Sequence, residues 1–225
     1  MTTSGTTTRT DDQIQREVAS ELDWTPGIDA AGIGVAVEQG TVALSGEVDS
    51  YYEKSAAKRA AFRVKGVHTV TDNLVVRKTS SVWSVSEREI ATNVEKAIAW
   101  LADAPNTVRA EIEKHRVILS GEVQWNYERV QAEQAVERVR GVTDVDNRIT
   151  LAKRASAADT AERIKNALAR SAALDAKAIS VTANGNTVTL TGAVRSWSER
   201  RVAENAAWAS PHVTAVHDQL TIRTN

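Results

Sequence analysis

Val42-Ala-Leu-Ser-Gly-Glu-Val48 is a short strand-like pattern that the chain repeats twice more. The second version reads Val117-Ile-Leu-Ser-Gly-Glu-Val123, and the third reads Val188-Thr-Leu-Thr-Gly-Ala-Val194. The glycines of the three versions are 75 and then 71 residues apart, at Gly46, Gly121 and Gly192. Self-similarity at a nearly fixed spacing is typical of repeated structural units. The sequence therefore predicts three copies of one small module.

The repeats divide the chain into a tail and three modules. We expect a disordered N-terminus at 1–10 and modules at 11–78, 86–154 and 159–225. The two linkers are short, so neighbouring modules are held close to one another. Trp83 lies in the first linker and is expected to pack against an adjacent module.

Each module opens with an amphipathic helix. Ile14, Val18 and Leu22 recur at every fourth position and so share one face of a helix. Trp24 and Trp100 end the first helices of modules 1 and 2, and we assign both to the core. An acceptor at the N-cap and a carboxylate or amide three residues later predict capping boxes. The pairs are Thr10 with Gln13, Ser86 with Glu89 and Asp159 with Glu162.

Two strands, a second helix and a third strand follow in each copy. Ile33, Val35 and Val37 alternate with smaller or polar residues, which is typical of a strand with one buried face. Gly66 and Gly141 are placed to end the second helices of modules 1 and 2 with a positive φ. The order is α-β-β-α-β. The predicted fold class is α+β, with three tandem modules, each a three-stranded mixed sheet with two helices packed on one face.

The composition excludes several classes of function. The formal net charge is -1, so no global field favours binding to nucleic acid. The chain has no cysteine, which excludes disulfides, thiolate metal sites and cysteine nucleophiles. No stretch is long and apolar enough for a transmembrane segment, and no secretory signal follows Met1. We expect a cytoplasmic protein from the sequence as it stands, and a periplasmic one if the true start lies upstream.

No catalytic, metal-binding or cofactor-binding pattern stands out. The four histidines form no pair at helical spacing with a glutamate between them, so no zinc-protease motif is present. Ser45, Ser120 and Thr191 precede the repeat glycines within strands, and no histidine pattern accompanies them. The interpretation is a protein that is not an enzyme. The repeat glycines themselves predict a bulge or the close approach of a helix to the sheet.

The last strand of each module begins with a second shared motif. It reads Gly66-Val-His-Thr-Val70 in the first copy, Gly141-Val-Thr-Asp-Val145 in the second and His212-Val-Thr-Ala-Val216 in the third. Together with the repeated strand motif and the alanine-rich second helix, this pattern resembles the BON domain family. The resemblance implies a bacterial envelope module, as in osmotically induced periplasmic proteins, that binds phospholipid membrane surfaces or envelope partners and has no shared catalytic motif.

The copies differ in charge and on one face of the second helix. Modules 1, 2 and 3 carry formal charges of -3, -1 and +2, so the third is the best candidate to meet an anionic surface. That face has an aromatic residue at both ends in modules 1 and 3 but is polar in module 2. Aromatic residues beside arginine are typical of protein interfaces and of membrane-surface helices. The candidate binding residues are Trp197, Arg195, Arg200, Arg201, Trp208, Tyr51, Lys58 and Phe62.

Two interpretations of this aromatic face remain open. The face either packs against a neighbouring module or binds an external partner. For an external partner, the first hypothesis is a non-enzymatic protein that attaches to anionic phospholipid surfaces. The alternative is a soluble, stress-related protein-protein interaction or scaffold module. The sequence names neither the lipid nor the partner, and it leaves the oligomeric state open.

Overall fold

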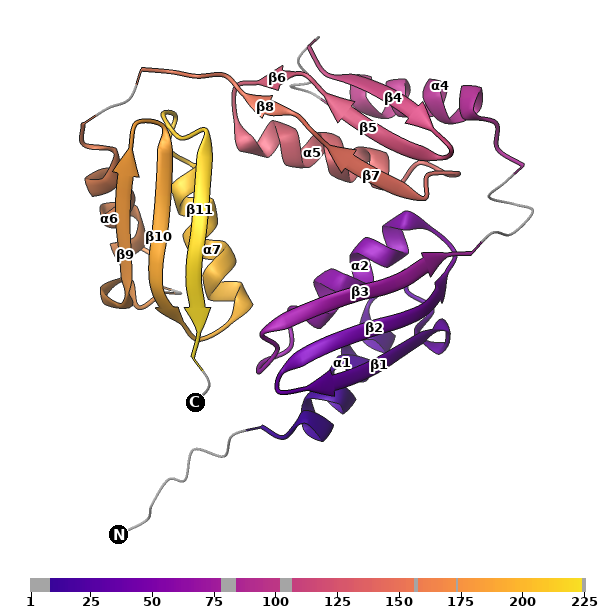
Figure 1. Cartoon of the computed structure of the whole chain (residues 1–225), viewed down its shortest axis with the longest axis horizontal. Helices are drawn as coiled ribbons and strands as arrows, with labels where there is room; N and C mark the ends of the chain where they lie inside the picture. Colours follow the sequence, from indigo (N-terminus) through magenta and orange to yellow (C-terminus); the bar gives the residue numbers. More distant parts are fainter. Residues whose placement is uncertain (1–8, 78–83, 102–106, 156–157, 173, 224–225) are drawn as a thin grey trace.

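A computed structural model describes the chain over residues 9–77, 84–101, 107–155, 158–172 and 174–223 (Figure 1). Within these residues the chain forms three small α/β modules, and each module has its own sheet and its own hydrophobic core. The predicted α+β class, with three tandem copies of one module, is confirmed. Trp83 and most of the N-terminal tail lie outside the described residues.

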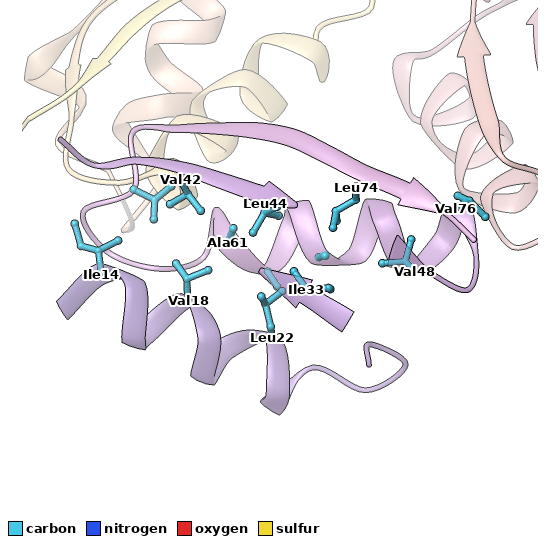
Figure 2. Packing of buried hydrophobic residues seen from close by; sticks show 13 residues of the cluster. Ile14, Val18, Leu22, Ile33, Val42, Leu44, Val48, Ala61, Leu74 and Val76 are labelled. Atoms are coloured by element: carbon cyan, nitrogen blue, oxygen red, sulfur yellow. The ribbon is translucent and has the colours of Figure 1, made fainter. Parts of the chain in front are cut away.

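Module 1 shows the shared plan. Its elements are α1 (Asp11–Trp24), η1 (Ala30–Gly32), β1 (Ile33–Glu38), β2 (Thr41–Val48), α2 (Tyr51–Ala61) and β3 (Thr69–Val76). The central strand β2 pairs antiparallel with β1 and parallel with β3, so the sheet is mixed as predicted. Both helices pack on the same face of the sheet (Figure 2).

Modules 2 and 3 repeat this plan with small changes. Module 2 contains α4 (Glu87–Ala99), β4 (Arg109–Glu113), β5 (Arg116–Ser120), β6 (Glu122–Val123), α5 (Asn126–Glu137), β7 (Asp144–Asn147) and β8 (Thr150–Leu151). Module 3 contains α6 (Thr160–Ala169), η2 (Ala176–Ala178), β9 (Ile179–Asn184), β10 (Thr187–Val194), α7 (Trp197–Trp208) and β11 (Ala215–Ile222). The central strand of module 2 is interrupted at Gly121, so its sheet divides into β4-β5-β7 and β6-β8.

The core of module 1 forms where the first helix meets the sheet. Figure 2 shows Ile14, Val18 and Leu22 projecting from α1 toward the strands that carry Val42 and Leu44. All five side chains are buried. Burying an aliphatic side chain of this size contributes about 1.5–3 kcal/mol relative to leaving it exposed. The apolar stripe read from the sequence is therefore the stripe that holds the module together.

The repeat glycines occupy backbone that only glycine adopts easily. Gly46 has a φ of +119°, and a Cβ added to it would lie 2.2 Å from the carbonyl oxygen of Gly32. Gly121 and Gly192 have similar φ values of +128° and +120°, and a Cβ added to either would also lie too close to a backbone carbonyl oxygen. The close approach is thus confirmed, and the neighbour is the backbone that leads into the first strand: the last residue of the short 3-10 helices η1 and η2 in modules 1 and 3, and Thr107 in module 2.

The helix ends follow the sequence signals in most cases. Both hydrogen bonds of the capping box form between Thr10 and Gln13 and between Ser86 and Glu89. The capping box predicted at Asp159 is wrong, because that side chain makes no capping hydrogen bond. Its backbone ψ of 6° departs from the extended conformation found at the other two caps.

Trp24 and Trp100 correct a further prediction. They are 84% and 88% exposed, although the sequence analysis placed both in the core. Each follows the last buried residue of its helix, Leu22 or Ile98, by two positions. Two positions on an α-helix correspond to roughly 200°, so the indole lies on the side opposite the core.

Candidate binding surfaces

The second helices of the three modules meet near the centre of the molecule. In Figure 1 the three sheets lie side by side toward the viewer, and α2, α5 and α7 lie between and behind them. The side chains at the ends of these helices make the contacts between modules. Each pair of modules is joined by an aromatic ring and at least one charged or polar partner.

Module 3 contacts module 1 through Trp197, the first residue of α7. Its ring centroid lies 4.2 Å from that of Phe62, at an interplanar angle of 51°. Its indole nitrogen donates a hydrogen bond of 3.0 Å to the backbone carbonyl oxygen of His68. The guanidinium of Arg200 lies 4.5 Å from the ring centroid on its own module. Stacking, a hydrogen bond and a cation-π contact therefore converge on one side chain.

Module 1 contacts module 2 through α2 and α5. Tyr51 packs against the cores of both modules. Burial raises the pKa of its hydroxyl, and the carboxylates of Asp144 and Glu137 in module 2 raise it further. Glu137 is also the acceptor of an ion pair with Arg59, at 3.0 Å, and its side chain is only 7% exposed. The two modules thus share an apolar contact beside a buried ion pair.

Module 2 contacts module 3 through Trp208, the last residue of α7. Trp208 packs against the cores of both modules. The guanidinium of Arg129 in α5 lies 5.0 Å from its ring centroid. Burial lowers the pKa of Arg129, and the neighbouring Glu133 raises it. A half-buried arginine on an aromatic face completes the third contact.

These contacts close into a ring. Trp197, five residues after its repeat glycine, meets Phe62, sixteen residues after the glycine of module 1. The contact between modules 1 and 2 uses the same two positions. Tyr51 lies five residues after Gly46, and Glu137 lies sixteen residues after Gly121. A head-to-tail contact that returns to its starting module gives a closed assembly. The structure therefore places the aromatic face between modules, which is the first of the two interpretations left open by the sequence.

The charged candidates have different surroundings. Arg200 forms an ion pair with Asp218 of β11, in addition to its contact with Trp197. Lys58 and Arg201 are exposed on α2 and α7. Arg195 is exposed at the end of β10, where it lines a groove shared with module 1. The structure thus brings the aromatic candidates into contacts between modules and leaves Lys58 and Arg201 exposed.

Glu204 on α7 has an unusual charge environment. Burial, the negative charge of Asp218 and a hydrogen bond with that carboxylate together raise its pKa to about 7, against the opposing effect of Arg200. Asp218 already accepts hydrogen bonds from the side chain of Arg200 and from the backbone of Leu220. The raised pKa keeps Glu204 protonated to a higher pH than an ordinary glutamate.

Glu204→Gln is expected to stabilise module 3 above pH 7. The raised pKa means that the folded state holds a proton that the unfolded state loses near its usual pKa of 4.5. Stability is therefore lost as the pH rises from about 4.5 to about 7, and the glutamine variant avoids this loss. Because Glu204 is half exposed, we expect a gain of only about 1 kcal/mol. Urea unfolding at pH 4.5 and pH 8 measures it, and an equal gain at both values would contradict the assignment.

The first helices present the most exposed aromatic side chains. Trp24 and Trp100 stand two positions after the last buried residue of α1 and α4, and Arg170 stands at the same place after α6. In Figure 1 these three helices lie on the side of the ring away from the sheets. The three side chains therefore occupy equivalent positions in the three modules. These three residues were not among the candidates named from the sequence, although their two-residue offset from the apolar stripe predicts that they are exposed.

The described residues contain no group of three or more histidine, aspartate and glutamate side chains placed to hold a metal ion. None of the helices in those same ranges is long and apolar enough to cross a bilayer.

Two solved structures are similar to the chain at low sequence identity. The solved C-terminal domain of CdsD, a structural protein of the type III secretion system of Chlamydia trachomatis, is 12% identical, with 92% of this chain and 96% of that chain covered and a TM-score of 0.27. The periplasmic domain of PrgH from S. typhimurium is also 12% identical, with 91% and 100% covered and a TM-score of 0.23. No curated protein matches the chain. The model of the BON domain matches residues 10–78, 86–153 and 156–224, so the chain belongs to the BON domain family.

Proposed function

We propose that this protein is a non-enzymatic binding protein that attaches to anionic phospholipid surfaces through the exposed ends of its first helices. The observation that carries the proposal is the pair of tryptophans, Trp24 and Trp100, which are 84% and 88% exposed at equivalent positions. Tryptophan is highly buried on average in folded proteins, so two tryptophans this exposed at equivalent positions favour a surface that meets a partner.

The ring turns two separate side chains into one attachment surface. The contacts between modules hold α1, α4 and α6 on one side of the molecule (Figure 1). Trp24 and Trp100 therefore reach a flat surface together, with Arg170 as the third point. Tryptophan prefers the interface between headgroups and acyl chains, and arginine is attracted to anionic headgroups. Two anchors on one rigid body bind more tightly than either anchor alone.

This surface differs from the one that the sequence analysis favoured. Trp197, Trp208, Tyr51 and Phe62 make contacts between modules, so a membrane would meet them only after the ring had opened. Opening would break the hydrogen bond of Trp197 and leave Glu137 without its partner Arg59. The first helices can instead bind without any rearrangement.

Replacing both Trp24 and Trp100 with alanine is expected to reduce binding to anionic vesicles at least tenfold. Each indole would lose its partition into the membrane interface, while folding stability would be unchanged because neither indole is packed. Co-sedimentation with vesicles containing phosphatidylglycerol measures the loss. Arg170→Ala is expected to reduce mainly the salt-sensitive part of vesicle binding.

A matched control uses an exposed apolar residue elsewhere. Val75 of β3 is 55% exposed on the sheet, so Val75→Ala removes apolar surface from the opposite side. It should leave vesicle binding unchanged. The proposal is wrong if the wild-type protein does not bind anionic vesicles at low salt, or if Val75→Ala weakens binding as much as the tryptophan variant.

A further inference from the structure

A groove of about 1200 Å³ lies between modules 1 and 3. One wall is formed by α1, which contributes Arg16, and by the turn after α2, which contributes Lys65. Module 3 contributes Arg195, Ile222 and Arg223 from the ends of β10 and β11. Because its walls come from two modules, the groove exists only while module 3 is docked on module 1.

The carboxylates that line the groove already have partners. Glu17 forms an ion pair with Arg9 at 3.2 Å, and Glu21 forms one with Arg63 at 2.6 Å. Asp11 accepts two backbone hydrogen bonds, of 2.7 and 3.0 Å, from the turn between β1 and β2. Glu17 and Glu21 are therefore already matched by cations, whereas Asp11 keeps its negative charge, and the lining Lys, Arg, Asp and Glu side chains together carry a net positive charge.

Four cationic side chains of the groove remain without such partners. They are Arg16, Lys65, Arg195 and Arg223, all exposed, and none forms an ion pair with any residue in the described ranges. The chain as a whole has a net charge of -1, so this local excess of positive charge is not a general property of the surface. Like charges around one groove repel one another, and an anion of matching charge would relieve that repulsion.

We propose that the groove binds a small molecule that carries two or more phosphate groups. Three of the four free cations are arginines, whose planar guanidinium binds the oxygen atoms of phosphate in pairs. The cations stand on four separate segments, so a ligand with several anionic groups engages more of them than a single phosphate does. The volume of about 1200 Å³ lies slightly above the range for small-molecule pockets, roughly 300–1000 Å³, which leaves room for a ligand with several phosphate groups.

Isothermal titration with inorganic tripolyphosphate and with inositol hexakisphosphate tests the proposal on the whole chain. We expect binding at low salt that weakens as salt is added. Arg195→Ala combined with Arg223→Ala should weaken it at least tenfold, because half of the free cations are lost. Trp197→Ala should also weaken it by undocking module 3, although Trp197 itself does not line the groove.

Lys58→Ala combined with Arg201→Ala is the matched control. This variant removes the same charge from exposed positions outside the groove and should leave the affinity unchanged. An equal loss in both double variants would overturn the proposal, since it would show general charge attraction. Tighter binding of a polyglutamate peptide than of tripolyphosphate would also overturn it, because the ligand would then be an acidic peptide.

Trp24 lines the groove as well as the proposed membrane surface, so Trp100 and the groove arginines are the residues that separate the two functions. The groove variant Arg195→Ala with Arg223→Ala should still sediment with anionic vesicles through its tryptophans. Conversely, Trp100→Ala should bind tripolyphosphate normally, because Trp100 does not line the groove. Vesicles of phosphatidylglycerol that still compete with tripolyphosphate when Trp24 and Trp100 are both replaced by alanine would show that the groove takes a lipid headgroup, and this result would overturn the assignment to a small phosphorylated ligand.

Discussion

Gly192→Ala is expected to destabilise module 3 by about 3 kcal/mol or more. The residue has a φ of +120°, a conformation that costs a side-chain-bearing residue about 1–3 kcal/mol. The new Cβ would also lie 2.1 Å from the carbonyl oxygen of Ala178, well inside the contact distance. Relieving this overlap requires β10 to move away from the start of β9, with the loss of sheet hydrogen bonds. Urea unfolding and hydrogen exchange of the β9–β11 amides measure the effect.

Gly185→Ala is the matched control on the same hairpin. Gly185 also has a positive φ, +58°, but a Cβ there would meet nothing within 4 Å. We expect a loss of only about 1–2 kcal/mol, the ordinary cost of a left-handed residue. If the two variants unfolded at the same urea concentration, the close approach at Gly192 would not be part of the fold.

Trp197→Ala is expected to release module 3 from module 1. The variant loses the ring contact with Phe62 and the hydrogen bond to the carbonyl of His68. Truncating a large packed aromatic costs about 3–5 kcal/mol, and here much of that loss falls on the contact between modules. Small-angle X-ray scattering should therefore show a larger radius of gyration, while the unfolding midpoints of the separate cores change little.

Two variants distinguish docking from a general effect of removing an indole. Trp100→Ala removes an indole that is 88% exposed, so the scattering curve should match that of the wild type. Trp197→Phe keeps the stacking on Phe62 but loses the hydrogen-bond donor, so its effect should be smaller than that of alanine. A compact Trp197→Ala variant would show that the remaining contacts of the ring hold module 3 in place by themselves.

The plan of each module could be predicted from the sequence because its signals are local. Ile14, Val18 and Leu22 follow the helical period, and Val42 and Leu44 follow the period of a strand. These periods fix which residues face the core whatever the rest of the chain does. The helical period also predicts that Trp24 is exposed, because Trp24 lies two positions after the last residue of the apolar stripe. Its assignment to the core failed because residue type was weighed above position.

The arrangement of the modules could not be predicted in the same way. An aromatic face beside arginine suits a membrane, a protein partner or a neighbouring module equally well, so composition alone does not choose between them. The tertiary structure distinguishes these alternatives, because Trp197 packs on Phe62, which is 135 residues away in the chain. Contacts between residues so far apart leave no periodic trace in the sequence.

The repeated strand motif, read by itself, determined three α-β-β-α-β modules with separate cores. Tertiary structure alone decided that these modules close into a ring, that Trp24 and Trp100 are exposed, and that Arg16, Lys65, Arg195 and Arg223 share one groove. The physical reason is that secondary structure follows from hydrogen bonds and side-chain periods over a few residues. A surface between modules depends on shape and charge from segments that meet only after each module has folded.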